Sequence, residues 1–229
     1  MTVRNGRHTW ALKKWKALQE QIDVLLAENK DLKLKISKLL VDSVTKLELV
    51  PEFEKRCLYE MARIEKKRQD SIDFPGEHIP RRFGFETHCV VFVDLDGLKW
   101  INDHSGEGHK GGDNILRAVA NSLKSKCRKD DLIVRRGEGG DEYLLLLAGC
   151  AKKDAIRILL MVRKDFEQGI AERFPSMVGK VSFSFGVREV TLQNTVEEIA
   201  QMTTEADKSM HKWKERRKMD RRAECYDGC

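Results

Sequence analysis

The stretch Arg135–Gly149, "RRGEGGDEYLLLLAG", places a pair of glycines and a pair of carboxylates directly before four consecutive leucines. A short apolar run bounded by glycine is typical of a buried strand, and paired glycines suit a turn that needs a positive φ. With the apolar residues before it, the stretch predicts a β-hairpin. Two acids beside a buried strand are costly to hold without a partner, so they indicate a chemical role.

The residues around this hairpin predict a domain of strands and helices. The run "HCVVFVDL" (88–95) is rich in β-branched residues and predicts a buried strand. The whole order is βαββαβα, with helices at 113–127, 152–174 and 195–218, hairpin strands at 131–136 and 142–149, and a last strand at 179–190. Thr195 is expected to cap the final helix. This order predicts an α/β (α+β) sandwich with a central, largely antiparallel sheet.

A heptad pattern runs through residues 10–50, which contain neither proline nor glycine. Isoleucine at position a with leucine at position d favours two parallel helices, and a single asparagine at a fixes their register. We therefore expect a parallel dimeric coiled coil. The alternative is one long helix whose apolar stripe packs on its own domain. Position a holds Trp15, Ile22, Asn29 and Ile36, and position d holds Leu18, Leu25, Leu32 and Leu39.

Breaks in this pattern divide the chain into parts. Pro51 ends the first helix, and a second helix is expected from about Glu52 to Gln69. The segment "DSIDFPGEHIPRR" (70–82) indicates a loop, because it contains two prolines and a glycine. The expected parts are an N-terminal coiled-coil helix (1–50), a second helix with a linker loop (51–82), the main domain (83–220) and a C-terminal tail (221–229).

Composition and charge restrict the function classes. No apolar run is long enough to cross a bilayer and no apolar signal core is present, so we expect a cytoplasmic protein that does not bind membranes. The six cysteines form no CxxC pair, which favours free thiols over a disulfide or metal site at Cys225 and Cys229. The net charge of +6 is uneven. Its basic block "HKWKERRKMDRR" (211–222) suits nucleic acid, acidic lipid, a phosphorylated ligand or a solvated helix end.

Carboxylates occur at two strand ends. Asp94 and Asp96 lie where the first strand ends, and Asp141 and Glu142 lie at the hairpin turn. If these strands are neighbours, Asp94 and Asp141 converge, and clustered carboxylates repel one another unless a cation lies between them. Hard cations such as Mg²⁺ take oxygen ligands and retain substrate phosphates, to which Lys99 would add a charge. The combination favours a nucleotide–metal site over acids that only cap strand ends.

Four motifs between about residues 88 and 218 resemble, in order, those of the GGDEF family of diguanylate cyclases. They are "FVDLDGLKWIND" followed by "GGDNIL", the hairpin "RRGEGGDEYLLLL", the strand "VSFSFGV" and the helix "EADKSMHKWKERRK". The resemblance implies a palm-like domain whose mostly antiparallel sheet has five strands. It also implies a reaction in which two GTP molecules, one on each of two facing domains, form cyclic di-GMP and release pyrophosphate. Two Mg²⁺ (or Mn²⁺) ions would serve each active site.

The resemblance also implies roles for individual residues. Asp94, the Leu95 carbonyl and Asp141 would bind the metal ions. Glu142 would assist in metal binding or in activating the 3′-hydroxyl, and Lys99 would hold the triphosphate.

Further residues would bind the nucleotide. Two hairpin glycines would let the backbone lie against it, and two basic residues on one face of the last helix would reach the triphosphate. A carboxylate can accept from the N1 and N2 hydrogens of guanine and has no such match on adenine, which favours GTP over ATP. The glycines are Gly139 and Gly140, the basic residues are Lys214 and Lys218, and the guanine-binding residues are Asn102 and Asp113.

The resemblance explains a homodimer and indicates feedback. Each domain would hold half of the reaction, and a parallel N-terminal coiled coil would raise the effective concentration of the second half-site. The basic helix would then serve the GTP substrate, without nucleic acid. Arg128 and Asp131, in "RKDD", match the RxxD pattern at which many family members bind their cyclic di-GMP product and are inhibited. Both side chains suit guanine edges.

Several positions depart from the family pattern. Tyr143 stands where phenylalanine is usual, and Gly97 replaces a bulkier residue. Two extra residues, "GE", precede the hairpin glycines, and two more lie between Asn102 and Asp113. The usual opening motif is barely recognisable in residues 70–82, and the helix expected between it and the first strand is missing or moved.

Three other functions are left open by these departures. The first is a cyclase or polymerase of the same fold that makes another cyclic dinucleotide. The second is a non-catalytic receptor that binds GTP or cyclic di-GMP through Arg128 and Asp131. The third is a coiled-coil protein that binds nucleic acid through the basic tail, which predicts steeply salt-dependent binding.

Overall fold

The computed structural model describes residues 21, 24–25, 28, 40–50, 52–73, 86–104, 106, 108–136 and 140–226, with 71–73 and 217–226 described by their backbone alone. The chain divides into two compact units, Met1–Val41 and Asp42–Cys229. In the first unit the few described residues include Leu25, a heptad d position, which is helical. The other heptad positions of the expected coiled coil lie outside the described residues.

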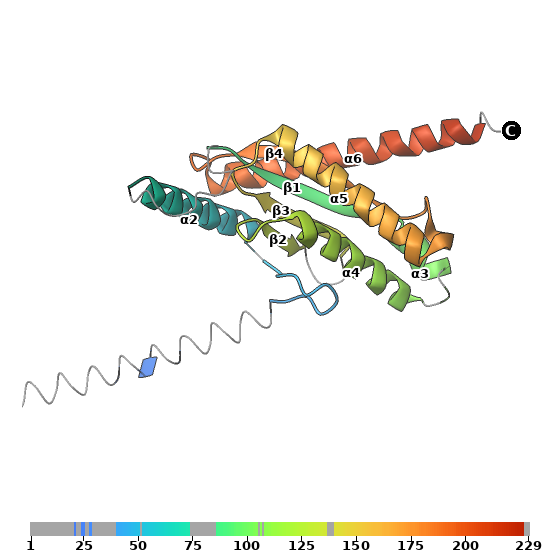
Figure 1. The fold of residues 1–229 in the computed structure, drawn as a ribbon, viewed down its shortest axis with the longest axis horizontal. Helices are drawn as coiled ribbons and strands as arrows, with labels where there is room; N and C mark the ends of the chain where they lie inside the picture. Colours follow the sequence, from blue (N-terminus) through green and yellow to red (C-terminus); the bar gives the residue numbers. More distant parts are fainter. Residues whose placement is uncertain are drawn as a thin grey trace, which may run out of the picture. The chain divides into compact units, whose positions relative to one another are not determined.

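The second unit contains one antiparallel sheet flanked by helices (Figure 1). Its elements are α2 (Phe53–Asp73), β1 (His88–Asp96), α3 (Leu98–His104), α4 (His109–Lys126), β2 (Leu132–Arg135), β3 (Glu142–Leu147), α5 (Lys152–Arg173), the 3-10 helix η1 (Pro175–Met177), β4 (Ser182–Val190) and α6 (Val196–Tyr226). The strand order is β2-β3-β1-β4, and every pair is antiparallel. The predicted order βαββαβα is confirmed, with two short helices, α3 and η1, that were not predicted.

The sheet differs from the expectation in its number of strands. The described residues form four strands, whereas five were expected. Beyond β2 the backbone of Glu48 pairs with Val134 in a single isolated parallel bridge. This contact does not continue into a ladder, so the segment that carries Glu48 covers the sheet edge without forming a fifth strand.

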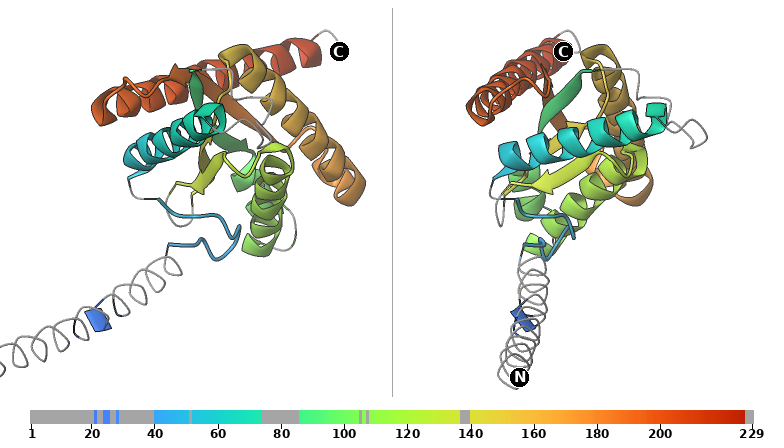
Figure 2. Two further views of the ribbon diagram at one scale, coloured as in Figure 1. Left: turned by 60° about the vertical axis from the view of Figure 1, so that its left-hand side comes forward. Right: turned by 90° about the vertical axis from the view of Figure 1, so that its left-hand side faces the viewer.

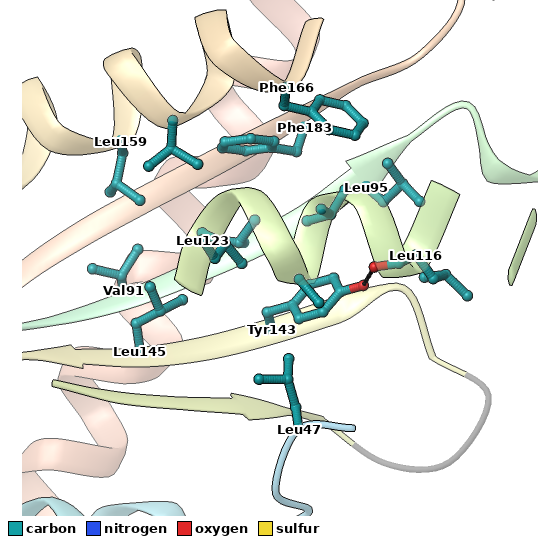
Figure 3. Close-up of a cluster of buried hydrophobic side chains, with 14 of the residues drawn as sticks. Leu47, Val91, Leu95, Leu116, Leu123, Tyr143, Leu145, Leu159, Phe166 and Phe183 are labelled. Carbon is teal, nitrogen blue, oxygen red and sulfur yellow. Dashed lines mark hydrogen bonds between the residues drawn. The ribbon is translucent and has the colours of Figure 1, made fainter. Parts of the chain in front are cut away.

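Helices cover both faces of the sheet, and the period-two alternation of a strand decides which residues meet which helices. On one face Val91 and Leu145 belong to a cluster with residues of α4 and α5, including Leu123 (Figure 3). On the other face lie α2 and α6 (Figure 2). Residues of these two helices form a cluster with Val90 and Phe92. Both faces are covered, which explains why β1 and β3 are continuous apolar runs rather than alternating ones.

An ordered turn precedes α2. The backbone N–H and the hydroxyl of Thr45 both donate to Asp42 Oδ1 at 2.6 Å, and Lys46 adopts a positive φ of 56°. The Glu48 carbonyl then accepts from the backbone N–H of Arg135 at 3.0 Å. The second helix, expected from about Glu52 to Gln69, is α2, and it continues to Asp73 into the segment that was expected to be a loop. Residues 74–85, where the missing helix was sought, lie outside the described residues.

Two local features position elements near the candidate site. At the start of α6 the Glu198 N–H donates to Thr195 Oγ1 at 3.2 Å, and the Thr195 N–H donates to Glu198 Oε2 at 3.0 Å. This reciprocal capping box confirms the expected cap. Between β1 and α3, Gly97 has a φ of 92°, and the Lys180 carbonyl lies against the position that a Cβ would take. A side chain at Gly97 would therefore be strained and would also clash.

Two further findings concern the cysteines and the apolar character of the helices. Cys57 and Cys89 are free thiols. The Cys225 side chain and Cys229, for which free thiols were expected, lie outside the described residues. None of the helices described is long and apolar enough to span a membrane.

Candidate active site

Asp94 and Asp96 lie on one face of the sheet at the end of β1. The Lys214 ammonium of α6 contacts Asp94 Oδ1 and lies 3.1 Å from Asp96 Oδ1. The Ser184 hydroxyl of β4 donates to Asp96 Oδ2 at 2.7 Å. Because a strand alternates faces with period two, the two acids point toward the helix that supplies Lys214. The sequence singled out Asp94 and Lys214 separately, and the structure joins them.

The hairpin acids lie directly beside Asp94. β1 and β3 are neighbours, and their register places Asp94 opposite Glu142. The Leu95 N–H donates to the Asp141 carbonyl at 3.1 Å, which ties the end of β1 to the hairpin turn. The predicted proximity of Asp94 and Asp141 is thus observed. Like charges placed directly opposite one another destabilise a sheet, so this arrangement is not explained by stability.

The pKa values at this cluster show a surplus of negative charge. Burial raises the pKa of Asp94, and the carboxylates of Asp141 and Asp96 raise it further, although the Lys214 ammonium acts in the opposite direction. Burial lowers the pKa of Lys214, but its bonds to Asp94 and Asp96 outweigh burial and raise it. One ammonium therefore serves several carboxylates without neutralising them all. A site of this kind attracts a further cation.

The carboxylates of this cluster do not by themselves form a complete metal-binding site. Among the described residues, no three His, Cys, Asp or Glu side chains are grouped so that they could hold a metal ion. Lys214 is the counter-ion of Asp94 and Asp96 in this arrangement. The oxygen ligands nonetheless suit Mg²⁺ or Mn²⁺ in type and charge, since such cations need few protein ligands and use substrate phosphates for the rest. The residues present therefore fit a divalent cation that arrives with a nucleotide.

Glu142 and the hairpin glycine are held by two consecutive arginines. Arg136 Nη1 lies 3.3 Å from Glu142 Oε2, in a partly exposed pair. The Arg135 guanidinium donates to the Gly140 carbonyl twice, from Nε at 2.9 Å and from Nη2 at 2.6 Å. A Cβ at Gly140 would lie 2.8 Å from the Arg136 carbonyl, so the tight turn excludes a side chain. Gly139 and the two inserted residues lie outside the described part of the chain.

Arg135 also makes a buried ion pair that the sequence did not reveal. Its Nη1 donates to Asp42 Oδ1 at 2.7 Å, and the two side chains are only 2% and 4% exposed. Burial alone would raise the pKa of Asp42, but the hydrogen bonds from Thr45 and Arg135 outweigh burial and lower it. The pair links the turn before α2 to the carbonyl of Gly140. The spacing of Asp42 and Thr45 is a turn signal, but nothing in the sequence pairs either with a residue so distant.

The residues expected to bind guanine lie on adjacent helices. Asn102 is on α3, and its buried Oδ1 has no hydrogen-bond partner among the described residues. This oxygen faces the Cα of Gly112 on α4, where a side chain would clash. Asp113 follows directly, half-exposed, with Oδ2 4.0 Å from Arg117 Nη2. The two extra residues between Asn102 and Asp113 therefore do not separate the helices that carry them. Lys99 is exposed on α3.

The RxxD residues are partly committed to local structure. Asp131 accepts from the Arg128 N–H at 2.7 Å and from the Ala148 N–H at 2.9 Å. Asp130 pairs with Arg63 Nη2 at 3.1 Å and with Lys67 Nζ at 3.0 Å, both from α2. The carboxylate of Asp131 thus closes the turn before β2.

Tyr143, the departure from phenylalanine after Glu142, is fully buried. Its hydroxyl donates to the Leu116 carbonyl of α4 at 3.1 Å (Figure 3). Burial raises the pKa of this phenol, so it stays protonated and remains a donor. The hydroxyl thus has the partner that a buried tyrosine requires.

Replacing Tyr143 with phenylalanine tests this explanation. We expect Tyr143→Phe to lower the free energy of unfolding by about 0.5–1.5 kcal/mol, the net worth of one buried hydrogen bond. Urea denaturation measures the change. Tyr59→Phe, at a position 62% exposed on α2, is the matched control and should leave the midpoint unchanged. A Tyr143→Phe protein as stable as the parent would show that the hydroxyl does not contribute.

Comparison with known proteins agrees with this geometry. Residues 82–220 match the family described as "Diguanylate cyclase, GGDEF domain". The chain is 41% identical over 70 residues to a probable diguanylate cyclase, DgcE of Escherichia coli K12, covering 31% of this chain and 6% of DgcE. It is 42% identical over 74 residues to the diguanylate cyclase TpbB of Pseudomonas aeruginosa, covering 32% of this chain and 16% of TpbB.

The fold is also similar to a solved structure. The coiled coil and GGDEF domain of DgcB from Caulobacter crescentus, in complex with c-di-GMP, superposes with a TM-score of 0.59 at 18% identity, covering 86% of this chain and 92% of that one. At this identity the likeness concerns the fold. The family match covers more than half of the chain, and the chain therefore belongs to the GGDEF family. It spans less than a fifth of the length of the two curated relatives named above.

Proposed function

We propose that this protein is a diguanylate cyclase that joins two GTP molecules into cyclic di-GMP and releases pyrophosphate. The observation that carries the proposal is the acidic cluster at the ends of β1 and β3, where Asp94 lies opposite Glu142 and is bonded by Lys214. A domain that had lost activity would gain stability by losing these repelling acids. Their presence in one cluster, within the family's motif, favours an active site.

The metal requirement follows from the surplus negative charge. Asp94 and Asp141, with the Leu95 carbonyl, would hold two divalent cations per active site, which would supply charge neutralisation for the triphosphate and for the attacking 3′-hydroxyl. Glu142 would have to leave Arg136 to take part. Lys214 would move from Asp94 toward the triphosphate as the cations arrive, and Lys99 would contact the triphosphate from α3. The Lys218 side chain lies outside the description, and its role rests on the sequence motif.

Base selection would depend on Asn102 and Asp113. The unpartnered Asn102 Oδ1 lies beside the helix that carries Asp113. A buried polar atom without a partner is costly, and a ligand that supplies the missing hydrogen bond is favoured. Asp113 would accept from the N1 and N2 hydrogens of guanine. These two residues would thus favour GTP over ATP.

A homodimer would complete the reaction. One domain would hold one nucleotide, and tethering two domains would raise the local concentration of the second half-site. Leu25, at a d position of the heptad pattern, is 63% exposed and would face the second chain. Cyclic di-GMP would inhibit the enzyme through the Arg128 side chain and Asp131, and Asp131 would have to share its carboxylate with the turn that it closes.

Substrate choice tests the proposed function. The full chain is incubated with Mg²⁺ and with GTP, ATP or both, and pyrophosphate release is followed over time. We expect release with GTP and none with ATP alone. Release with both nucleotides that exceeds the GTP rate would indicate a mixed product and overturn the assignment of guanine selectivity to Asp113. Tight GTP binding without release would favour a receptor instead.

Lys214 is predicted to compete with the divalent cation. Without nucleotide, we expect Lys214→Met to lower the dissociation constant for Mn²⁺ by about an order of magnitude, the size of effect that one neighbouring charge has on a carboxylate. The same variant should raise the KM for GTP. Calorimetry and pyrophosphate release measure the two effects. Lys208→Met, exposed on the same helix, is the control. Weaker Mn²⁺ binding in Lys214→Met would contradict the competition.

A further inference from the structure

A cavity of about 330 Å³ opens at the edge strand β4, between α5 and α6. Both helices pack on β4, as Figure 1 shows. The residues lining it on α6 are Ser209, Lys212, Trp213 and Arg216, whose spacing of i, i+3, i+4 and i+7 defines one helix face. Lys214 is not among the lining residues, so this cavity is distinct from the acidic cluster.

The rim of the cavity is cationic. It is formed by Lys152, Arg188, Lys212 and Arg216. Arg188 is held in place, with Nε donating to Glu205 at 3.1 Å and Nη2 donating to the Ser209 hydroxyl at 2.7 Å. The other acid nearby, Glu189, accepts from the Lys152 N–H at 2.8 Å. Within the described part of the chain, no carboxylate pairs with the side chains of Lys152, Lys212 or Arg216.

The floor of the cavity is apolar and aromatic. Ile156 and Leu160 of α5 are 37% and 39% exposed, and Trp213 is 48% exposed. The Arg163 guanidinium lies 5.8 Å from the ring centroids of both Phe185 and Trp213. This cation–π contact fixes the two rings while both still line the cavity. Fixed aromatic rings lose little freedom when a ligand stacks on them.

We propose that this cavity is a second nucleotide-binding site, which takes a nucleoside phosphate without a metal ion. Aromatic rings stack on any base, and lysine and arginine side chains bind phosphate oxygens. A cavity of about this volume suits one small ligand, since small-molecule pockets begin near 300 Å³. An extended nucleic acid or an acidic membrane would use the cations but would leave much of the apolar floor unfilled.

The site differs from the acidic cluster in its response to metal. At Asp94 the surplus negative charge repels a triphosphate in the absence of divalent cations. At the β4 cavity the surplus charge is positive, and phosphate is attracted directly. Binding of GTP in a chelator therefore reports this site rather than the acidic cluster, whereas cyclic di-GMP could also bind at Arg128 and Asp131. The inference goes beyond the proposed cyclase activity and does not require turnover.

The test is calorimetric titration of the full chain in EDTA at low salt with GTP, with cyclic di-GMP and with inorganic pyrophosphate. We expect nucleotide binding that weakens with added salt, and pyrophosphate binding that is weaker because it has no ring. Trp213→Ala should weaken nucleotide binding by at least about fivefold, and Lys212→Gln with Arg216→Gln should weaken all three ligands. Arg128→Ala is the control for the RxxD motif and should not change the GTP titration.

Several results would overturn the proposal. They are the absence of nucleotide binding in EDTA, equal affinity in Trp213→Ala and the parent, and loss of the GTP signal in Arg128→Ala. Both substitutions of the double variant, Lys212→Gln and Arg216→Gln, are at exposed positions. A circular dichroism spectrum that matches the parent's shows that this variant keeps the fold. Binding of phosphatidylglycerol vesicles or single-stranded DNA without binding of nucleotides would assign the surface to a macromolecule instead.

Discussion

Asp94→Asn is expected to reduce the rate of GTP turnover at least about a hundredfold, because a metal ligand that stabilises transition-state charge is worth several kcal/mol. Asp94 is the most buried of the clustered acids and is contacted by Lys214. The substitution keeps the shape and removes the charge. Pyrophosphate release from GTP with Mg²⁺ measures the effect. Asp154→Asn, on the exposed start of α5, is the matched control and should keep the parent rate.

The same variant separates activity from stability. Because the folded-state pKa of Asp94 is raised, folding disfavours its charged form, and the loss of stability begins as the pH rises through the unfolded-state pKa and is complete above the folded-state pKa. We therefore expect Asp94→Asn, in EDTA at neutral pH, to be at least as stable as the parent. A variant that is inactive and less stable would contradict this account, and so would one that retains the parent's activity.

Arg135→Leu is expected to lower the free energy of unfolding by about 3–5 kcal/mol, because it leaves the buried Asp42 carboxylate without its partner. The same change removes two hydrogen bonds to the Gly140 carbonyl. Arg136→Leu, one residue later, is the matched control. Its pair with Glu142 is 55% and 36% exposed, and we expect a loss below about 1 kcal/mol. Urea denaturation at neutral pH measures the free energy of unfolding of both variants. Equal losses in the two would contradict a stabilising role of the buried pair between Arg135 and Asp42.

The effect of Arg135→Leu should also depend on pH. The folded-state pKa of Asp42 is lowered, so the stability it contributes is present above the unfolded-state value and is lost as the pH falls through the folded-state value. Below that pH Asp42 is neutral in both proteins. We expect the difference between parent and Arg135→Leu to shrink on acidification, measured from urea curves at a series of pH values. A constant difference would show that charge pairing is not the cause.

The features that could be predicted from the sequence are those that local residue patterns determine. β1 and β3 were recognisable because both faces are covered and their residues are apolar throughout. The proximity of Asp94 and Asp141 followed once the strands were taken as neighbours, and the cap at Thr195 followed from residue types alone. Tyr143 was flagged as a departure, and the structure supplies its partner, the Leu116 carbonyl.

Contacts between distant segments could not be predicted. Asp42 and Arg135 lie far apart in the sequence, and neither an aspartate nor an arginine by itself indicates a buried ion pair. The contact of Lys214 with Asp94 and Asp96 could not be predicted, because it depends on how α6 packs on β1. The turn at Asp42 was not predicted, because residues 10–50 carry a heptad pattern without proline or glycine, and the first helix was expected to continue to Pro51. The cavity at β4 combines residues of three elements, and no short motif contains them.

The most direct test of the central claim is the identity of the product. Purified full chain, free of carried-over cyclic di-GMP, is incubated with GTP and Mg²⁺ beside Asp141→Ala, and the products are identified by mass spectrometry. We expect cyclic di-GMP from the parent and none from the variant. A linear or adenine-containing product, cyclic di-GMP from both proteins, or no product from a dimeric parent would contradict a cyclase whose metal site lies at the hairpin.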